Sequence, residues 1–360
     1  MRFLLALVLA AAPAAAQHRD ALPVPDLPGY RTLKCDFHTH TVFSDGEVWP
    51  TTRVVEAWRD GLDAIAITDH AGYNPHEKDL KPDLSRPHAI ALPLAEQLGL
   101  ILVPAVEIAE KDFHCNALFV TDFNAFFSLG MAEALEVARK QDAFVFWNHP
   151  GWKETPQWEP PASTLHERGL IQGFELVNET TVYPEAFPWA KEHRLAIFAN
   201  SDIHAPATAF YTSRERPVTL VFVRTPDLAG IRDALPARRT AAWVNDEVWG
   251  AEEHLTALWK GAVQVENPEV RLKPGARLAL RLRNRSAIPF RIRMTGAPSW
   301  LRIGDAEVRP EGVVGTALSV SKGAPPGTHE VELDTEVGNF HITPERNLMV
   351  KVLLRVEISK

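Results

Sequence analysis

The chain has 360 residues, a length that favours two domains over one. Its hydrophobic fraction of 46% and charged fraction of 23% are ordinary for a soluble globular protein. The net charge of −8 argues against a protein that binds nucleic acid through a broad basic surface.

Residues 1–16 have the pattern of a secretory signal peptide. Arg2 gives a charged start, residues 3–12 an apolar core, and residues 14–16 (Ala-Ala-Ala) a small-residue cleavage site. The apolar run is too short to span a bilayer, and no other segment approaches that length. We therefore expect a secreted or periplasmic protein with no membrane span in its mature chain, beginning with a proline-rich linker at residues 17–30.

From Arg31 onward, short apolar runs alternate with segments of helical periodicity. The expected strands are 33–37, 64–68, 100–106, 117–121, 143–147, 174–177, 195–199 and 218–223. The expected helices are 51–60, 87–98, 131–140, 184–193 and 226–234. Short strands that alternate with helices indicate parallel β/α units, and about seven such units suggest a closed or nearly closed barrel over residues 31–260.

The pattern changes after about Gly261, where helical periodicity disappears. Apolar and polar residues then alternate, for example in 277–283, 290–294 and 348–358, and Pro-Gly clusters separate these runs. This pattern predicts a small all-β sandwich domain, immunoglobulin-like, at residues 261–360.

The segment 34–46 carries the first chemical signal. His38 and His40 are two residues apart at the end of an expected strand, so their side chains should project to the same face. Asp45 follows in a turn with Gly46 and can bring a carboxylate to the same place. Two imidazoles and a carboxylate together are the beginning of a metal site.

Further histidines and acids stand at or near the ends of later strands. Asp202 and His204 repeat the two-residue spacing. Glu107 ends an apolar strand, where a carboxylate is unfavourable without a partner such as a metal ion. The other histidines in such places are His70, His114 and His149. Because strand ends converge on one face of a barrel, this joint placement predicts a single metal site.

The order H-x-H, S-D-G, T-D-H, E, H, N-H-P, S-D-x-H, spread over roughly residues 31–246, resembles the polymerase and histidinol phosphatase (PHP) family of metal-dependent phosphoesterases. The resemblance implies a distorted (βα)7-type barrel and two or three divalent ions, for which Mn, Zn and Fe are equally suitable. It implies three ligand sets: His38, His40, Glu107 and Asp202; Asp45, His70 and His204; and a bridging Glu107 with His114 and His149. Asp45 stands where many relatives have histidine.

The charges are consistent with this assignment, because two or three divalent ions carry more positive charge than the carboxylates of Asp45, Glu107 and Asp202 neutralise. Such a site favours an anionic phosphate ester over a neutral amide. We expect a metal-bridging hydroxide, held by Glu107, Asp202 and His204, to attack a small phosphorylated substrate, either a monoester or a diester.

Other side chains could support the site. Arg214 or Arg216 could reach a substrate phosphate, and Trp152 could wall the pocket, although a solvated arginine and simple packing are the alternatives. Asp69 and Asn148 could receive a hydrogen bond from the second nitrogen of a ligand histidine.

Two further functional readings stay open: an amidohydrolase-type metal hydrolase, and a non-enzymatic surface or carbohydrate-binding protein acting through the β domain. No expected barrel strand ends in a lysine that could bridge two metals, which disfavours the first. Cys35 and Cys115 should be buried free thiols rather than a disulfide. The substrate and the oligomeric state do not follow from the sequence.

Overall fold

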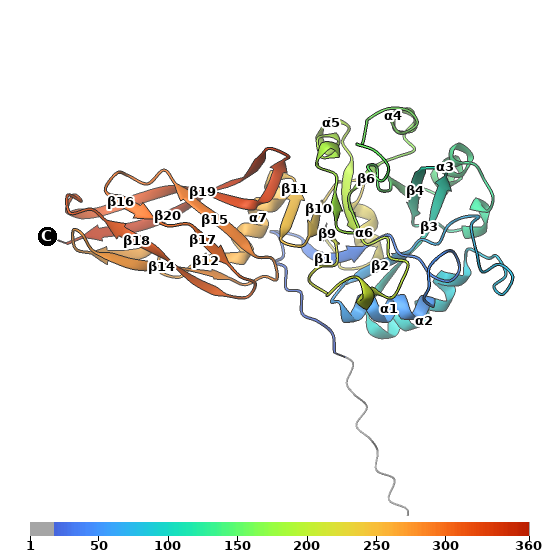
Figure 1. Cartoon of the computed structure of the whole chain (residues 1–360), viewed down its shortest axis with the longest axis horizontal. Coiled ribbons are helices and arrows are strands. Elements are labelled where there is room, and N and C mark those ends of the chain that lie inside the picture. Colours follow the sequence, from blue (N-terminus) through green and yellow to red (C-terminus); the bar gives the residue numbers. More distant parts are fainter. Residues whose placement is uncertain (1–17, 360) are drawn as a thin grey trace, which may run out of the picture.

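The structure is a computed structural model that describes residues 18–359. The expected signal peptide lies outside the described residues. The chain forms an α/β part followed by an all-β part, and the two lie end to end in Figure 1. None of the helices within residues 18–359 has the length and apolar character needed to cross a membrane.

The α/β part contains short strands and helices close to the expected positions. Its strands are β1 (Arg31–Asp36), β2 (Ala64–Ile67), β3 (Ile101–Glu110), β4 (Phe113–Leu118), β5 (Phe144–Trp147), β6 (Gly173–Asn178), β7 (Thr181–Val182), β8 (Ala196–Asn200), β9 (Val218–Val223), β10 (Thr240–Val244) and β11 (Glu247–Gly250). Its helices are α1 (Pro50–Arg59), α2 (Arg86–Leu98), α3 (Met131–Lys140), α4 (Ala162–Glu167), α5 (Trp189–Glu192), α6 (Leu228–Ala234) and α7 (Glu252–Ala262), with short 3-10 turns at Phe123–Phe126, Pro184–Ala186 and Ala207–Ala209.

The sheet of this part runs in the order β11-β10-β9-β1-β2-β3-β4-β5-β6, with β8 beside β6. Parallel pairing is confirmed for β1-β2-β3 and for β5-β6-β8. It is wrong for β4 and β9, which pair antiparallel with their neighbours, and β10, which is not among the expected strands, also pairs antiparallel with β9. The reason is plain at β4, because the two residues between β3 and β4 allow a hairpin and cannot form a crossover.

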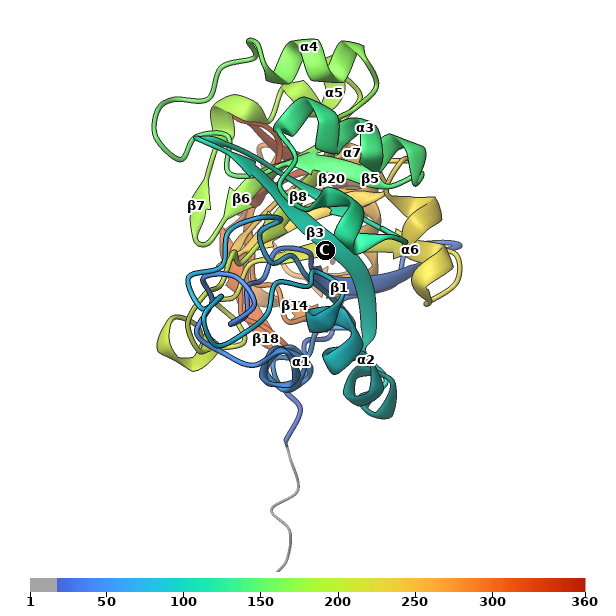
Figure 2. The same ribbon diagram turned by 90° about the vertical axis from the view of Figure 1, so that its right-hand side faces the viewer.

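The sheet curls so that β8 returns toward β1 and β9. The Thr219 hydroxyl on β9 accepts a hydrogen bond from the Ala199 N–H and donates one to the Ala199 carbonyl, each 2.9 Å long. In Figure 2, which views the α/β end, α1 and α2 lie below the strands and α3, α4 and α5 lie above them. The result is a strongly curved sheet with helices outside it, which brings separate strand ends near one another.

The all-β part consists of two sheets. One contains β13 (Glu269–Leu272), β20 (Arg346–Ile358), β19 (Gly327–Thr343), β15 (Phe290–Thr295) and β17 (Ala306–Val308), and the other contains β12 (Val263–Val265), β14 (Arg277–Asn284), β18 (Val313–Val320) and β16 (Leu301–Ile303). Apolar residues of both sheets, such as Leu280 and Leu354, share one core. The expected alternating strands are confirmed, and a relation to the immunoglobulin fold stays a prediction.

The two parts are joined by packing and by strand pairing. β11 pairs in parallel with β19 through Val248 and Phe340, and α7 contacts both β11 and β20. The segment expected to be a linker is also packed: Leu22 is buried, and the Pro23 carbonyl accepts a hydrogen bond of 2.7 Å from the Ala287 N–H in the all-β part. Its apolar residues fill the core between the two parts.

The cysteine prediction is confirmed, since Cys35 and Cys115 are both free and fully buried. Burial raises the pKa of both thiols well above the ordinary cysteine value.

Candidate metal centre

The carboxyl ends of β1 and β8 meet and carry four of the predicted ligands. After β1, the His38 carbonyl accepts a hydrogen bond of 2.9 Å from the Asp202 N–H, and the His40 N–H donates one of 3.0 Å to the Ile203 carbonyl. This backbone contact places His38 and His40 beside Asp202, with both imidazoles fully buried. The two-residue spacings recognised in the sequence therefore face each other across one strand junction.

His38, His40 and Asp202 form the tightest group. The Nε2 atoms of His38 and His40 lie 3.1 and 3.0 Å from Oδ1 of Asp202. Glu107, at the end of β3, reaches the same place, with its carboxylate oxygens 3.4 Å from His38 and 3.3 Å from His40. Donor atoms of the first three residues lie within 4.8 Å of one another, close enough to share an ion.

A second group surrounds Asp45. Its carboxylate oxygens lie 3.5 Å from Nε2 of His70 and 3.3 Å from Nε2 of His204. His40 also belongs to this group, with its Nδ1 3.7 Å from the Asp45 carboxylate. The structure thus brings together the predicted set of Asp45, His70 and His204, and adds His40 to it.

The third group differs from the predicted one. Glu107 lies 3.1 Å from Nδ1 of His114, as expected, but the third member is His70, with its Nδ1 3.0 Å from Glu107. His149 stands beside the group, its ring centre 4.9 Å from that of His114 and its Nε2 4.0 Å from Asp202. Glu107 lies between this group and the first one, with its carboxylate oxygens also close to His38 and His40.

The donor atoms fit metal ions because they lack other partners. Within residues 18–359, the buried side-chain atoms without a hydrogen bond include His38 Nε2, His40 Nε2, Asp45 Oδ1, His70 Nδ1, Glu107 Oε2 and His149 Nδ1. Unpartnered buried polar atoms are costly, and so many of them close together fit a site that binds cations. Imidazole nitrogen and carboxylate oxygen together suit Zn, Mn or Fe.

Electrostatics in this cluster are governed by opposing charges. Burial disfavours the charged form of His70, but the Glu107 and Asp45 carboxylates outweigh it and raise the pKa of His70 to about 11. Burial also disfavours the charged form of Glu107 and would raise its pKa, but His70 and His38 outweigh this effect and hold the pKa of Glu107 well below its ordinary value. The carboxylates are therefore ionised and ready to hold a cation.

Glu175 on β6 is a partner that the sequence reading missed. It is fully buried, and its Oε1 accepts a hydrogen bond of 2.8 Å from His38 Nδ1, which leaves Nε2 of His38 as the nitrogen that faces Asp202. Its signal was present, because Glu175 interrupts an apolar strand in the same way as Glu107.

The two expected outer partners do not contact histidine rings. Asn148 donates a hydrogen bond of 2.8 Å to Glu107 and so orients a carboxylate. Asp69 accepts hydrogen bonds from the Thr41 N–H, at 2.7 Å, and from the Ser44 hydroxyl, at 2.6 Å. Asp69 therefore fixes the loop that carries Asp45.

A cavity of about 400 Å³ opens beside the three groups. Trp152 lies in its wall, 54% exposed, with its ring centre 5.2 Å from that of His149. The prediction for Arg216 is wrong: its guanidinium is buried and pairs with Asp36 at 2.8 Å and Asp60 at 2.7 Å. Arg214 does not line the cavity either and lies 3.6 Å from Glu311 of the all-β part.

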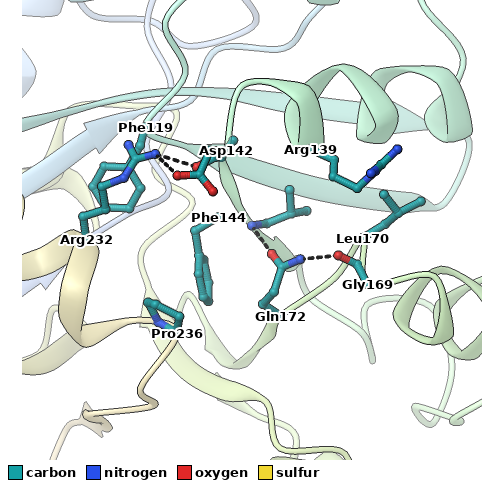
Figure 3. Close-up of a pocket in the computed structure, with 11 residues that line it drawn as sticks. Phe119, Arg139, Asp142, Phe144, Gly169, Leu170, Gln172, Arg232 and Pro236 are labelled. Atoms are coloured by element: carbon teal, nitrogen blue, oxygen red, sulfur yellow. Dashed lines mark hydrogen bonds and ion pairs between the residues drawn. The ribbon is translucent and has the colours of Figure 1, made fainter.

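A second hollow, of about 310 Å³, lies at the opposite, amino-terminal ends of β5 and β6 (Figure 3). Of its two arginines, Arg232 pairs with Asp142 at 2.7 Å and Arg139 with Glu136 at 2.6 Å. Gln172 bridges the backbone of Val145 and Gly169. Its polar groups are thus satisfied within the protein, and none of the predicted site residues lines it.

An α/β sheet whose strand ends gather histidines and carboxylates around shared centres defines a metal-binding protein. No family model matches the chain. It is 36% identical to a two-domain protein of Bacteroides vulgatus that contains a predicted PHP-like metal-dependent phosphoesterase; the match covers 94% of this chain and 100% of that one, with a TM-score of 0.87. The chain therefore belongs to the PHP-like metal-dependent phosphoesterase family.

Two other similarities are more limited. An uncharacterized protein of Methanocaldococcus jannaschii is 50% identical over 46 residues, which is 13% of this chain and only 21% of that protein. A proposed metal-dependent phosphoesterase from Bifidobacterium adolescentis is 16% identical, with a TM-score of 0.41 over 56% of this chain and 94% of that one. Neither similarity adds to the assignment.

Proposed function

We propose that this protein is an exported hydrolase of phosphoesters that works with two or three divalent ions, Mn, Zn or Fe. One observation carries the proposal: His40 and His70 each belong to two clusters of closely spaced donor atoms, and Glu107, a member of one cluster, lies 3.4 Å from His38 and 3.3 Å from His40 of another. Shared ligands of this kind suit adjacent ions that act on one substrate group.

Bound ions would supply a water of lowered pKa as nucleophile and positive charge for the phosphoryl oxygens. The protein's own part is to hold the donors in place. Glu175 fixes the ring of His38, Asn148 fixes Glu107, and Asp69 fixes the loop of Asp45. Glu107, Asp202 and His204 line the cavity at its metal end, where a phosphate would bind.

The test uses purified full chain stripped by a chelator and reloaded with Mn²⁺, Zn²⁺ or Fe²⁺. We expect hydrolysis of p-nitrophenyl phosphate or its bis-ester after reloading, and bound metal by mass spectrometry. Glu107→Gln should lose about a hundredfold or more in activity and part of the bound metal, whereas His76→Ala, at an exposed site, should change neither. Absence of turnover with every metal and both esters would refute the proposal.

The amidohydrolase alternative gains no support from the lysines near the site. Lys153 pairs with Asp112, and Lys111 is exposed, so neither stands among the clustered donors.

Export is part of the proposal because residues 1–16 have a signal-peptide pattern. Amino-terminal sequencing of protein from a periplasmic fraction should begin at Gln17; recovery of the uncleaved chain in the cytoplasm would contradict export.

A further inference from the structure

The outer wall of the metal cavity is built by two neighbouring segments. One is the hairpin between β6 and β7, which contributes Asn178, Glu179 and Thr181, with Tyr183 following it. The other is the turn after His149, in which the Trp152 N–H donates a hydrogen bond of 3.0 Å to the His149 carbonyl. These segments would surround the part of a bound phosphoester that lies beyond its phosphate.

This wall contains no cationic side chain among the described residues that line the cavity. Arg216 is held by Asp36 and Asp60, and Arg214 lies against the all-β part. The nearest ammonium group, on Lys153, pairs with Asp112 and lies 4.6 Å from the centre of the Trp152 ring. The one charged group of the wall is the carboxylate of Glu179, which is exposed and has no ion pair among the described residues.

The wall instead offers neutral hydrogen-bonding groups. The side-chain amide nitrogen of Asn178 donates hydrogen bonds to Glu175 at 2.8 Å and to Asp202 at 3.2 Å. The side-chain carbonyl oxygen of Asn178 has no hydrogen-bond partner within residues 18–359. The ring of Tyr183 is buried against Gly151, where an added Cβ would lie only 2.4 Å from it. The Tyr183 hydroxyl likewise has no hydrogen-bond partner within the described part of the chain, and burial raises its pKa, so it stays a proton donor.

We propose that the substrate of this site carries a single phosphate on an uncharged, polyhydroxylated alcohol of the sugar type. This inference depends on the phosphoesterase function proposed above. The hydroxyls of such a group would meet Asn178, Glu179, Thr181 and Tyr183, and its apolar face would stack on Trp152. The cavity, at about 400 Å³, lies toward the small end of ligand pockets.

The same wall disfavours other phosphoesters. A second phosphate would lie near the Glu179 carboxylate, and the nearest ammonium group, on Lys153, is already paired with Asp112, so this phosphate would be repelled. A quaternary ammonium group would meet the Lys153 charge at the Trp152 ring, where that lysine already makes the cation–π contact.

The experiment compares kcat/KM of the metal-loaded enzyme for p-nitrophenyl phosphate, a glucose monophosphate, glucose bisphosphate and phosphocholine. We expect the glucose monophosphate to exceed both glucose bisphosphate and phosphocholine by about tenfold or more. Equal or better turnover of the bisphosphate or of phosphocholine would overturn the inference while p-nitrophenyl phosphate turnover upheld the phosphoesterase function. Loss of all turnover would refute both.

Variants of the hairpin give a second measurement. In calorimetric titrations with a non-hydrolysable glucose phosphonate, Thr181→Val and Trp152→Ala should each weaken binding by about fivefold or more. Glu179→Lys should raise the relative kcat/KM for the bisphosphate by about tenfold. The matched controls are Thr180→Val, beside Thr181 but outside the cavity wall, and Glu185→Lys, an exposed site with the same charge change. Equal effects in variants and controls would contradict the assignment.

Discussion

At the scale of single residues, Glu175 does the most to organise the centre without lining the cavity. Its two oxygens accept four hydrogen bonds, from the His38 ring, the His149 backbone, and the amides of Asn178 and Asn200, all between 2.8 and 2.9 Å. Four hydrogen bonds hold the Glu175 carboxylate in one orientation, and its bond to Nδ1 in turn fixes the orientation of the His38 ring.

Replacement of Glu175 by glutamine keeps the volume but turns one acceptor into a donor, which cannot accept the His38 proton. We expect metal affinity to fall about tenfold to a hundredfold, as for other outer partners of metal ligands. Competition with a chromophoric chelator would measure this fall. Glu185→Gln, at an exposed position, is the control, and unchanged affinity in Glu175→Gln would remove its positioning role.

Arg214 and Arg216 have different roles, because one lies in an exposed contact and the other in a buried ion pair. Arg216→Ala should destabilise the fold by about 3–5 kcal/mol, because it leaves Asp36 and Asp60 without their partner in a buried place. Arg214→Ala breaks an exposed contact with Glu311 and should cost less than about 1 kcal/mol. Urea unfolding would measure both free energies. Comparable losses in the two variants would contradict this division.

The residues of the centre differ in how far the sequence could predict them. The sequence could predict four of them from local features, namely their two-residue spacing and their place at strand ends: His38, His40, Asp202 and His204. The burial of Arg216 could not be predicted from the sequence, since its partner Asp36 lies 180 residues away and the pairing depends on the completed sheet. The third cluster differed for the same reason.

At the scale of elements, α1 is anchored to the centre by one buried side chain. Arg53 donates to the carbonyls of His40 at 2.8 Å, Ile203 at 3.0 Å and His204 at 2.5 Å, and it pairs with Glu56 at 2.7 Å. The guanidinium thus connects the loop after β1 with the loop after β8. Ligands carried by two distant segments are held at a fixed separation by this contact.

Arg53→Lys retains the charge but cannot reach the same set of carbonyls. We expect a loss of about 3 kcal/mol in stability from the unpaired buried groups. Metal affinity should also fall at temperatures where circular dichroism shows an intact fold, since the two loops lose their connection. Arg59→Lys, exposed in the last turn of the same helix, is the control. Lowered stability with unchanged metal affinity would show that Arg53 supports only the fold.

The elements themselves were predicted well where they are long and periodic, as for α3, which begins and ends at the expected residues. Strand direction was harder, because a strand such as β9 has the same apolar composition whether it runs parallel or antiparallel to β1. The structure was needed to decide it, since neighbours in the sheet are set by contacts between distant segments.

At the scale of the whole molecule, the two parts meet at a cluster of charged and aromatic side chains. Glu247 on β11 accepts a hydrogen bond of 2.6 Å from His341 on β19 and pairs with Arg291 on β15. The His341 ring stacks on Trp249, with 4.1 Å between ring centres. The sequence predicted two domains, but this contact could not be foreseen from alternation patterns that specify each domain by itself.

The junction should make stability depend on pH. Burial opposes ionisation of Glu247, but His341 and Arg291 outweigh it and lower its pKa below the ordinary glutamate value of 4.5. The stabilisation is therefore fully present above pH 4.5 and is lost as the pH falls through the lower pKa of the folded state. Glu247→Gln should lower the free energy of unfolding by about 1 kcal/mol at neutral pH, since the pair is partly exposed. Calorimetric unfolding of both proteins from neutral to acidic pH should show this difference shrinking on acidification, with Glu253→Gln as the exposed control; a difference independent of pH would mean that Glu247 acts through packing rather than charge.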